Sequence, residues 1–381
     1  MGSDFDVIVA GGSIGGLTFA AEAARRGARV LVAEEHQEIG EPEKCDGLIS
    51  LRLLRSYGYT PAPGVIQNRI DAGAVHSPGG RSLTVDTRSL DLVVLDRSMY
   101  DKQVASLASA RGARIETGVR VGGYKESRGS VEVKVGQVVR TAKYLIDATG
   151  PASSPRRGIL PAAKYEISAD WISEHLVEVF LDVEKYPSFF AWIIPYGPGL
   201  AKVGVAGRSI GAFRALDDFL SGRPHRVLRK VAAPIYIGGP VKSFLQGRKV
   251  FVGESAGVTK PTTAGGIVTS VVGAVLAARR CSEAIRTDDI SPLSRYQSDW
   301  DERFGKEMRN MLRLRGVFEK LSNTDLDAMV TIFSSPKLLT KLSHSDFDFH
   351  ATGLLGALGV RGVLGLARIV ASTEARSLLL G

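Results

Sequence analysis

The chain has 381 residues, of which 44% are hydrophobic and 23% charged, a composition typical of a globular protein with a substantial core. Two cysteines exclude a disulfide framework or a thiolate metal cage, and the lack of a run of about eighteen uncharged apolar residues argues against a transmembrane helix. The net charge of +9 suits a membrane surface or a phosphorylated substrate. Because no nucleic-acid module is recognisable, we expect no nucleic-acid partner. The two cysteines fit a reducing compartment, so we expect a cytoplasmic protein.

The N-terminus predicts a dinucleotide-binding βαβ unit. An apolar strand over residues 6–10 runs into a glycine turn, a helix follows over 17–25, and a second strand over 28–33 ends in Glu34. In such a unit Gly11 allows the tight turn, Gly15 and Gly16 let backbone N–H groups approach a pyrophosphate, and Glu34 accepts the ribose hydroxyls. Ser13 replaces a glycine of the usual pattern, which weakens this close approach without abolishing it.

The remaining elements predict a chain that enters a second, sheet-based unit twice. We expect short strands at 72–76 and 82–86, a helix over 99–111, a hairpin over 130–148, strands at 176–183, 189–195 and 201–206, a strand at 249–253 and a helix over 265–285. The nucleotide-binding domain then comprises 1–52, 92–160 and 245–290, the sheet domain 53–91 and 161–244, and a helical region 291–381. A cleft between the first two is a usual place for a ligand.

Three further segments indicate a flavoprotein. In residues 147–151 a strand ends in Ala-Thr-Gly. Such a strand end is common in flavin enzymes, where it passes near the FAD, so we expect Gly150 beside the cofactor. Residues 250–257 run from a strand into Gly-Glu-Ser-Ala-Gly, where Glu254 can bond the ribityl chain. Gly265, Gly266 and Ile267 open a long helix whose N–H groups would face the flavin pyrimidine edge and stabilise the charge of reduced flavin. Each segment alone could be an ordinary turn, but their order and spacing favour the flavoprotein.

With these motifs the sequence resembles the geranylgeranyl reductase family (digeranylgeranylglycerophospholipid reductase-like), a branch of the p-hydroxybenzoate-hydroxylase-like FAD flavoproteins. The resemblance covers roughly residues 4–335. It includes 42–47 as a Pro-x-x-Cys-x-Gly loop, 95–101 as an Arg-x-x-Phe-Asp segment with Tyr100 for Phe, and 190–195 as a relaxed Tyr-x-Trp-x-Phe-Pro motif. Glu254 stands where the family usually has Asp.

The resemblance implies an α/β (α+β) fold, with a Rossmann-like FAD-binding domain, an antiparallel β-sheet substrate domain and a helical C-terminal region. By position it implies FAD contacts from Gly15, Glu34, Cys45, Asp46, Arg97, Val121, Glu254, Gly266 and Ile267. It also implies that Phe190, Trp192 and Pro195 line an apolar substrate tunnel. The six histidines lack metal-ligand spacing, so we expect no metal.

The activity implied by the resemblance is the saturation of C=C bonds of geranylgeranyl chains, on archaeal-type ether lipid precursors (digeranylgeranylglycerophospholipid). Reduced FAD would deliver a hydride from N5 to one carbon, and a proton would reach the other. Cys45 has the chemistry and expected position to donate that proton, although a cysteine there could equally be a small hydrophobe under the cofactor. Without a second nucleotide fingerprint, the electron donor would be ferredoxin or a transiently bound NAD(P)H.

Two other enzymes and a scaffold remain as alternatives. Aromatic monooxygenases carry Asp-Gly followed by x-x-Ser-x-x-Arg, and this chain keeps Ser153 and Arg156 but has Thr149 in place of that Asp. A halogenase would have Trp-x-Trp-x-Ile-Pro, where Phe190 replaces the first Trp. A non-catalytic FAD-binding protein is the alternative from outside the enzymes.

The C-terminal segment 354–370 is apolar, with Arg361 and Arg368 seven residues apart on one side of a predicted helix. This pattern favours an interfacial helix that docks the protein peripherally on a lipid surface, where the chains of such a substrate reside. The alternative is a terminal helix packed on the core, and its glycines lower helix stability in either case.

Overall fold

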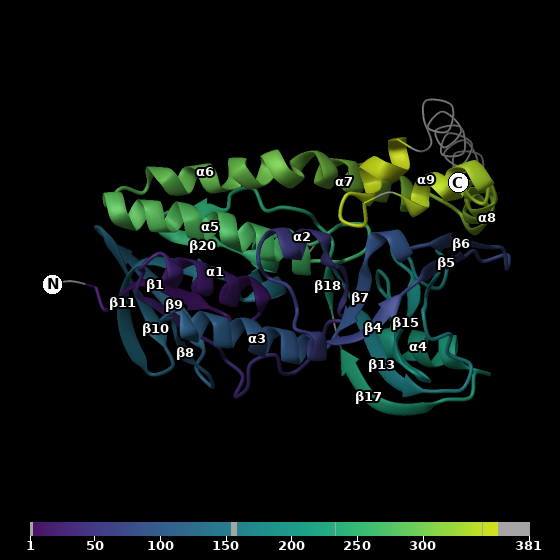
Figure 1. The fold of residues 1–381 in the computed structure, drawn as a ribbon, viewed down its shortest axis with the longest axis horizontal. Helices are drawn as coiled ribbons and strands as arrows, with labels where there is room; N and C mark the ends of the chain where they lie inside the picture. Colours follow the sequence, from purple (N-terminus) through teal and green to yellow (C-terminus); the bar gives the residue numbers. More distant parts are fainter. Residues whose placement is uncertain (1–2, 154–157, 233, 345, 357–381) are drawn as a thin grey trace.

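The computed structural model describes residues 3–153, 158–232, 234–344 and 346–356, and its strands form two large sheets with smaller ones between them (Figure 1). The first sheet has the order β19-β20-β11-β1-β2-β8, in which β20, β11, β1, β2 and β8 run parallel, and the hairpin β9–β10 extends from β11. Its strands are β1 (Phe5–Ala10), β2 (Val30–Ala33), β8 (Arg114–Glu116), β9 (Val121–Ser127), β10 (Ser130–Val135), β11 (Val138–Asp147), β19 (Leu245–Gln246) and β20 (Lys249–Phe251).

The second sheet has the order β17-β13-β16-β15-β14-β5-β6 and is antiparallel except where β14 runs parallel to β5. Its strands are β5 (Ala72–His76), β6 (Ser82–Asp86), β13 (Ala162–Ser168), β14 (Leu176–Phe180), β15 (Ala191–Gly197), β16 (Leu200–Ala206) and β17 (Arg226–Ala232). Two small sheets, β3-β7-β4 and β12-β18, are formed by β3 (Leu48–Ser50), β4 (Ile66–Ile70), β7 (Leu92–Leu95), β12 (Ile159–Leu160) and β18 (Ile235–Tyr236).

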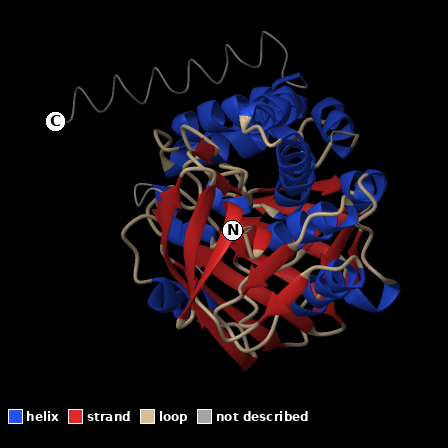
Figure 2. Ribbon diagram, turned by 90° about the vertical axis from the view of Figure 1, so that its left-hand side faces the viewer, coloured by secondary structure: helices blue, strands red, loops and turns tan. Residues whose placement is uncertain are grey.

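The helices within residues 267–343 run along one side of the molecule, above the strands, whereas earlier helices lie lower, beside the sheets (Figures 1 and 2). The helix α1 contacts both α3 and α5, and α6 lies against α5. Trp300, Tyr296 and Phe244 are almost completely buried, and the Phe244 ring contacts both of the other rings. The helices are α1 (Ile14–Arg25), α2 (Leu51–Ser56), α3 (Arg97–Ala110), α4 (Ala212–Leu220), α5 (Ile267–Thr287), α6 (Ser291–Trp300), α7 (Lys306–Phe318), α8 (Asn323–Phe333) and α9 (Pro336–Ser343), with a π-helical turn over Asp301–Gly305 between α6 and α7.

The predicted fold class is confirmed: a parallel α/β unit, an antiparallel sheet and a helical region are all present. Several elements were not predicted: the stretch expected to open a β segment begins with the helix α2, and the helix α4 and the strand β17 had no predicted counterpart. Most of the apolar segment 354–370, together with Arg156, lies outside the described residues. Among the helices that are described, none is both long and apolar enough to cross a membrane.

The turn between β1 and α1 is packed so closely that two of its glycines have backbone as their nearest neighbour. Gly11 has a φ of +106°, and a Cβ there would lie 2.4 Å from the Ala148 carbonyl oxygen. A Cβ at Gly16 would lie 2.1 Å from the Gly11 carbonyl oxygen. The ends of β1 and β11 and the start of α1 therefore meet at a distance that excludes any side chain.

We expect Gly16→Ala to destabilise the protein, although alanine usually stabilises a helix relative to glycine by about 1 kcal/mol. The new methyl group would press on backbone atoms that cannot move aside, at a cost of about 1–3 kcal/mol. Urea unfolding of the two proteins measures the difference. Gly123→Ala is the matched control, because its Cβ would meet nothing within 4 Å, and equal stability of Gly16→Ala and the parent chain would contradict the packing described.

Candidate cofactor and active site

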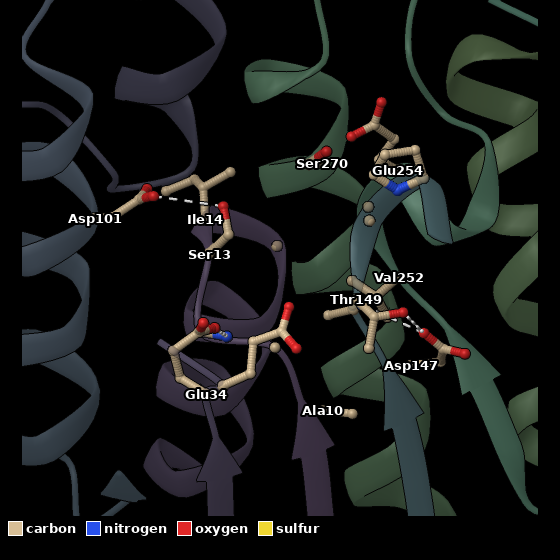
Figure 3. A pocket seen from close by; sticks show the side chains of 18 of the residues that line it. Ala10, Ser13, Ile14, Glu34, Asp101, Asp147, Thr149, Val252, Glu254 and Ser270 are labelled. Carbon is tan, nitrogen blue, oxygen red and sulfur yellow. Dashed lines mark hydrogen bonds between the residues drawn. The ribbon is translucent and has the colours of Figure 1, made fainter. Parts of the chain in front are cut away.

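A cavity of about 640 Å³ lies where the parallel strands β1, β2 and β11 end (Figure 3). Ala10, Ala33 and Asp147, the last residues of these strands, all line it. The carboxyl ends of parallel strands are the usual ligand position in open α/β sheets, and the volume is within the range of small-molecule and cofactor sites.

Most of the residues expected to bind the cofactor lie on the wall of this cavity. They are Gly11, Ser13, Gly15, Glu34, Cys45, Arg97, Val121, Gly150, Glu254, Gly266 and Ile267. Three others do not line it: Gly16 is packed against Gly11, Asp46 lies beside Lys164, and Gly265 lies against Lys260. The cavity thus gathers residues that are up to about 250 positions apart in the chain.

Glu34 is held at the end of β2 by the turn that it faces. Its Oε2 accepts a hydrogen bond from the Gly12 backbone N–H at 2.6 Å, and its Oε1 accepts one from the His36 backbone N–H at 2.9 Å. The His36 ring nitrogen Nδ1 also lies 2.6 Å from Oε1. These contacts fix the carboxylate on the cavity wall, where further lone pairs can accept hydroxyl groups of a ligand.

A buried ion pair at the start of α3 faces the helix α1. Arg97 Nη2 donates to both carboxylate oxygens of Asp101, at 2.9 and 3.2 Å, and Ser13 Oγ donates to Asp101 at 3.4 Å (Figure 3). Burial alone would lower the pKa of Arg97, but its interactions with Asp101 and Cys45 raise that pKa above its ordinary value, so the guanidinium remains charged. Its buried Nε has no hydrogen-bond partner within the described chain.

The start of two helices adds donors to the same cavity. The first turns of α1 and α5 reach the cavity, and neither helix has a side-chain cap among the described residues. Their first backbone N–H groups and partial positive charges therefore suit anionic groups of a ligand. Together with the unpartnered Arg97 Nε, they fit a dinucleotide such as FAD, which carries a pyrophosphate and, when reduced, an anionic ring.

Glu254 lies on the opposite wall, beyond Val252 in Figure 3. Burial raises the pKa of this carboxyl to about 7, against smaller opposing effects from the Tyr236 backbone and Lys44. Below it, Asp147 accepts a hydrogen bond from Thr149 Oγ1 at 2.7 Å and stiffens the end of β11. The cavity thus has one side where the Arg97 guanidinium stays charged and another side where Glu254 titrates near neutral pH.

Two of the three residues expected to contact substrate, Phe190 and Trp192, belong to a separate apolar cluster. Phe189 and Phe190 stack with ring centroids 4.0 Å apart, and both meet Trp192 edge-on. The Pro195 carbonyl accepts a hydrogen bond from Asn68. None of Phe190, Trp192 and Pro195 lines the cavity, but Ile235 and Ala264 both line it and pack against the larger apolar cluster that includes Trp192.

The loop before α5 is held by contacts with residues 348–350. Lys260 forms a buried ion pair with Asp348 at 3.2 Å, and Thr262 Oγ1 lies 2.6 Å from His350 Nε2. Burial, with the charge of Lys260, lowers the pKa of His350 to about 3, so its ring is neutral at physiological pH. Residues 348–350 therefore hold in place the segment that leads to Gly266 and Ile267.

Sequence reasoning missed several polar residues of the wall. Glu43, Asp101, Asp147 and Ser270 all line the cavity. Asp101 lies four residues after Arg97 on α3, and such pairs share a helix face, but the predicted helix over 99–111 left Arg97 outside it. Glu43 carried no such signal, because its partners come from distant strands.

The raised pKa of Glu254 predicts a pH dependence of stability in the flavin-free protein. Between pH 4.5 and about 7 the unfolded chain ionises at this position while the folded protein keeps the proton, so stability falls as the pH rises. The loss amounts to roughly 3 kcal/mol over that window and is complete above pH 7. Glu254→Gln removes this contribution, so its advantage over the parent chain in urea unfolding should grow from pH 4.5 to pH 7.

Glu132→Gln serves as the control, because this exposed glutamate of β10 takes part in no ion pair within the described chain, so the substitution should leave the pH dependence of the unfolding free energy unchanged. Parallel curves for the parent chain and Glu254→Gln across this window would show that Glu254 ionises as readily in the folded protein as in the unfolded one.

Comparison with known proteins agrees with the geometry. No family model matches the chain, but "Digeranylgeranylglycerophospholipid reductase 1" of Methanopyrus kandleri is 31% identical over 374 residues, which cover 89% of this chain and 96% of the relative. The crystal structure of a geranylgeranyl bacteriochlorophyll reductase-like protein from Thermoplasma acidophilum superposes with a TM-score of 0.87 at 22% identity, covering 97% and 99% of the two chains. A flavin-dependent brominase shares the fold at a TM-score of 0.68 and 14% identity, over 98% and 99% of the chains. The chain therefore belongs to the geranylgeranyl reductase family.

Proposed function

We propose that this protein is an FAD-dependent reductase that saturates C=C bonds of geranylgeranyl chains on a digeranylgeranylglycerophospholipid. The observation that carries the proposal is the 31% identity to a digeranylgeranylglycerophospholipid reductase over almost the whole of both chains. The cavity supports it, because its wall carries the donors, the acidic residue and the cysteine that such a reaction needs.

FAD is proposed to occupy the cavity at the ends of β1, β2 and β11. The N–H groups around Ser13 and Gly15 would hold the pyrophosphate, Glu34 the ribose hydroxyls and Glu254 the ribityl chain, with Gly266 and Ile267 at the pyrimidine edge. The remaining proposed contacts are Gly11, Cys45, Arg97, Val121 and Gly150 on the wall, with Gly16, Asp46 and Gly265 supporting it from behind. The proposed domains are those given by the sequence, with FAD held by 1–52, 92–160 and 245–290.

The reduction needs a hydride and a proton. Reduced FAD supplies the hydride for one alkene carbon when it is bound. The second carbon takes a proton from Cys45, whose thiol is on the cavity wall and interacts with the Arg97 guanidinium. An isolated alkene accepts hydride poorly, so the proton donor provides a large part of the rate.

The isoprenoid chain is proposed to reach the flavin through the apolar cluster of Phe190, Trp192 and Pro195. Ile235 and Ala264 support this path, because they connect the cluster to the cavity. The electron donor is proposed to be ferredoxin or NAD(P)H. Docking on a membrane through residues 354–370 remains a proposal from the sequence.

Anaerobic incubation of the dithionite-reduced protein with a geranylgeranylated glycerophospholipid tests the reaction. Mass spectrometry should find products heavier by successive pairs of hydrogens, one pair for each saturated bond. Unchanged lipid, with NADPH and oxygen consumed on addition of aromatic acids, would favour an aromatic monooxygenase. A stable flavin spectrum without turnover of either substrate would favour a non-catalytic FAD-binding protein.

The two cysteines provide a matched test of the proton donor. Cys45→Ala should lower the rate of lipid reduction by about two to four orders of magnitude, because it removes the acid. Cys281→Ala should reduce lipid at close to the parent rate, since Cys281 is completely buried in α5. Single-turnover reduction of the lipid measures both, and a Cys45→Ala rate within a factor of about three of the parent would assign the proton to another group.

A further inference from the structure

Three cations from adjacent strands of the second sheet converge on the loop that carries Cys45. Lys202 lies on β16, Lys164 on β13 and Arg229 on β17, and the sheet order is β17-β13-β16. Each contacts the loop 41–47. We call these three side chains the cation clasp.

The two lysines are the buried members of the clasp, with side chains only 1% exposed. Lys202 Nζ donates to Glu43 Oε1 at 3.0 Å and to the backbone carbonyls of Asp46 and Leu95 at 3.4 and 3.5 Å. Lys164 Nζ donates to the Cys45 carbonyl at 2.9 Å and lies 3.6 Å from Asp46 Oδ1. Their charged ends are thus directed at the main chain of the loop.

Acidic residues balance these charges. Glu43 is buried, and although burial would raise its pKa, Lys202 and Lys164 outweigh that effect and hold the pKa below its ordinary value. Arg229 lies 3.5 Å from Glu41 and 3.7 Å from both Glu43 and Glu166. Glu166 pairs in register with Lys202 on one side and Arg229 on the other, so the clasp occupies one face of three neighbouring strands.

A buried ion pair often stabilises the folded state no more than well-packed apolar residues of similar volume would. What such a pair can add is specificity, because its contacts favour one arrangement of the chain. Here that arrangement is the path of the loop 43–46. Lys164 holds the Cys45 carbonyl and so limits the directions in which the Cys45 thiol can point. The thiol itself interacts with Arg97.

The same face of the sheet also carries Trp192. Gly204 pairs in register with Lys164 on one side and Trp192 on the other, so all three residues project from one face. The indole ring covers Gly204, where an added Cβ would lie only 2.3 Å from a ring atom. Lys164 therefore stands between the aromatic cluster and the Cys45 loop.

We propose that Lys164 is a positioning residue, which holds the Cys45 carbonyl so that the thiol faces the cofactor cavity. Lys202 and Arg229 support the same loop through Glu41 and Glu43. The importance of the thiol for catalysis rests on the proposed function, but its orientation does not. The position of a proposed proton donor is thus set by the sheet that carries the candidate substrate residues.

The orientation of the thiol can be measured by how strongly bound FAD protects Cys45 from alkylation. The full-length protein is treated with iodoacetamide with and without saturating FAD, and mass spectrometry follows the peptides that contain Cys45 and Cys281. FAD should slow alkylation of Cys45 at least about tenfold in the parent chain, since the thiol lies on the wall that FAD would cover. In Lys164→Met the protection should fall below about threefold, at an FAD concentration that saturates that variant.

Lys230→Met is the matched control, because this exposed lysine lies on the neighbouring strand β17 and should retain the full protection. Circular dichroism checks the fold of each variant. If Lys164→Met does not fold, Lys164→Met combined with Asp46→Asn removes both charges together and takes its place in the same assay.

Full protection in a folded Lys164 variant, or no protection in the parent chain, would overturn the proposal. The assay contains neither lipid nor reductant. Failure of the proposed reductase activity would therefore leave its result unaffected, and the two proposals can fail separately.

Discussion

The close approach of backbone to backbone at the ends of β1 and β11 is the constraint on which the rest of the site depends. Gly11 and Gly16 leave no room for side chains between these strands and α1, so the helix begins directly at the strand ends. The cavity lies just beyond this close approach, at the ends of β1, β2 and β11. The acidic residue of β2, the ion pair of α3 and the start of α5 are then arranged around that opening.

Features set by neighbouring residues could be predicted from the sequence. The glycine turn, the alternation of apolar residues and the acid at the end of β2 act over a few positions, so β1, α1 and Glu34 were predictable. The strand ending at Asp147 and the helix following Gly266 were recognisable for the same reason. Most of the predicted cofactor residues accordingly line one cavity.

Features set by distant pairing could not be predicted in the same way. The parallel pairing of β5 with β14 joins segments about one hundred residues apart, and no local pattern indicates it. On β13, Lys164 and Glu166 alternate with apolar Tyr165 and Ile167, which is the pattern of a strand with one face in water. The loop 41–47 covers that polar face, so an apparently solvated surface is an interior contact between two parts of the chain.

The brace formed by Asp348 and His350 has a consequence for the order of assembly. The glycine turn, β2 and α3 are all synthesised before residues 348–350, which hold the loop before α5. Because domains fold progressively during synthesis, the early half of the cavity can form while its other wall is still untethered. A cofactor between the two walls would then be held firmly only after residues 348–350 have been translated.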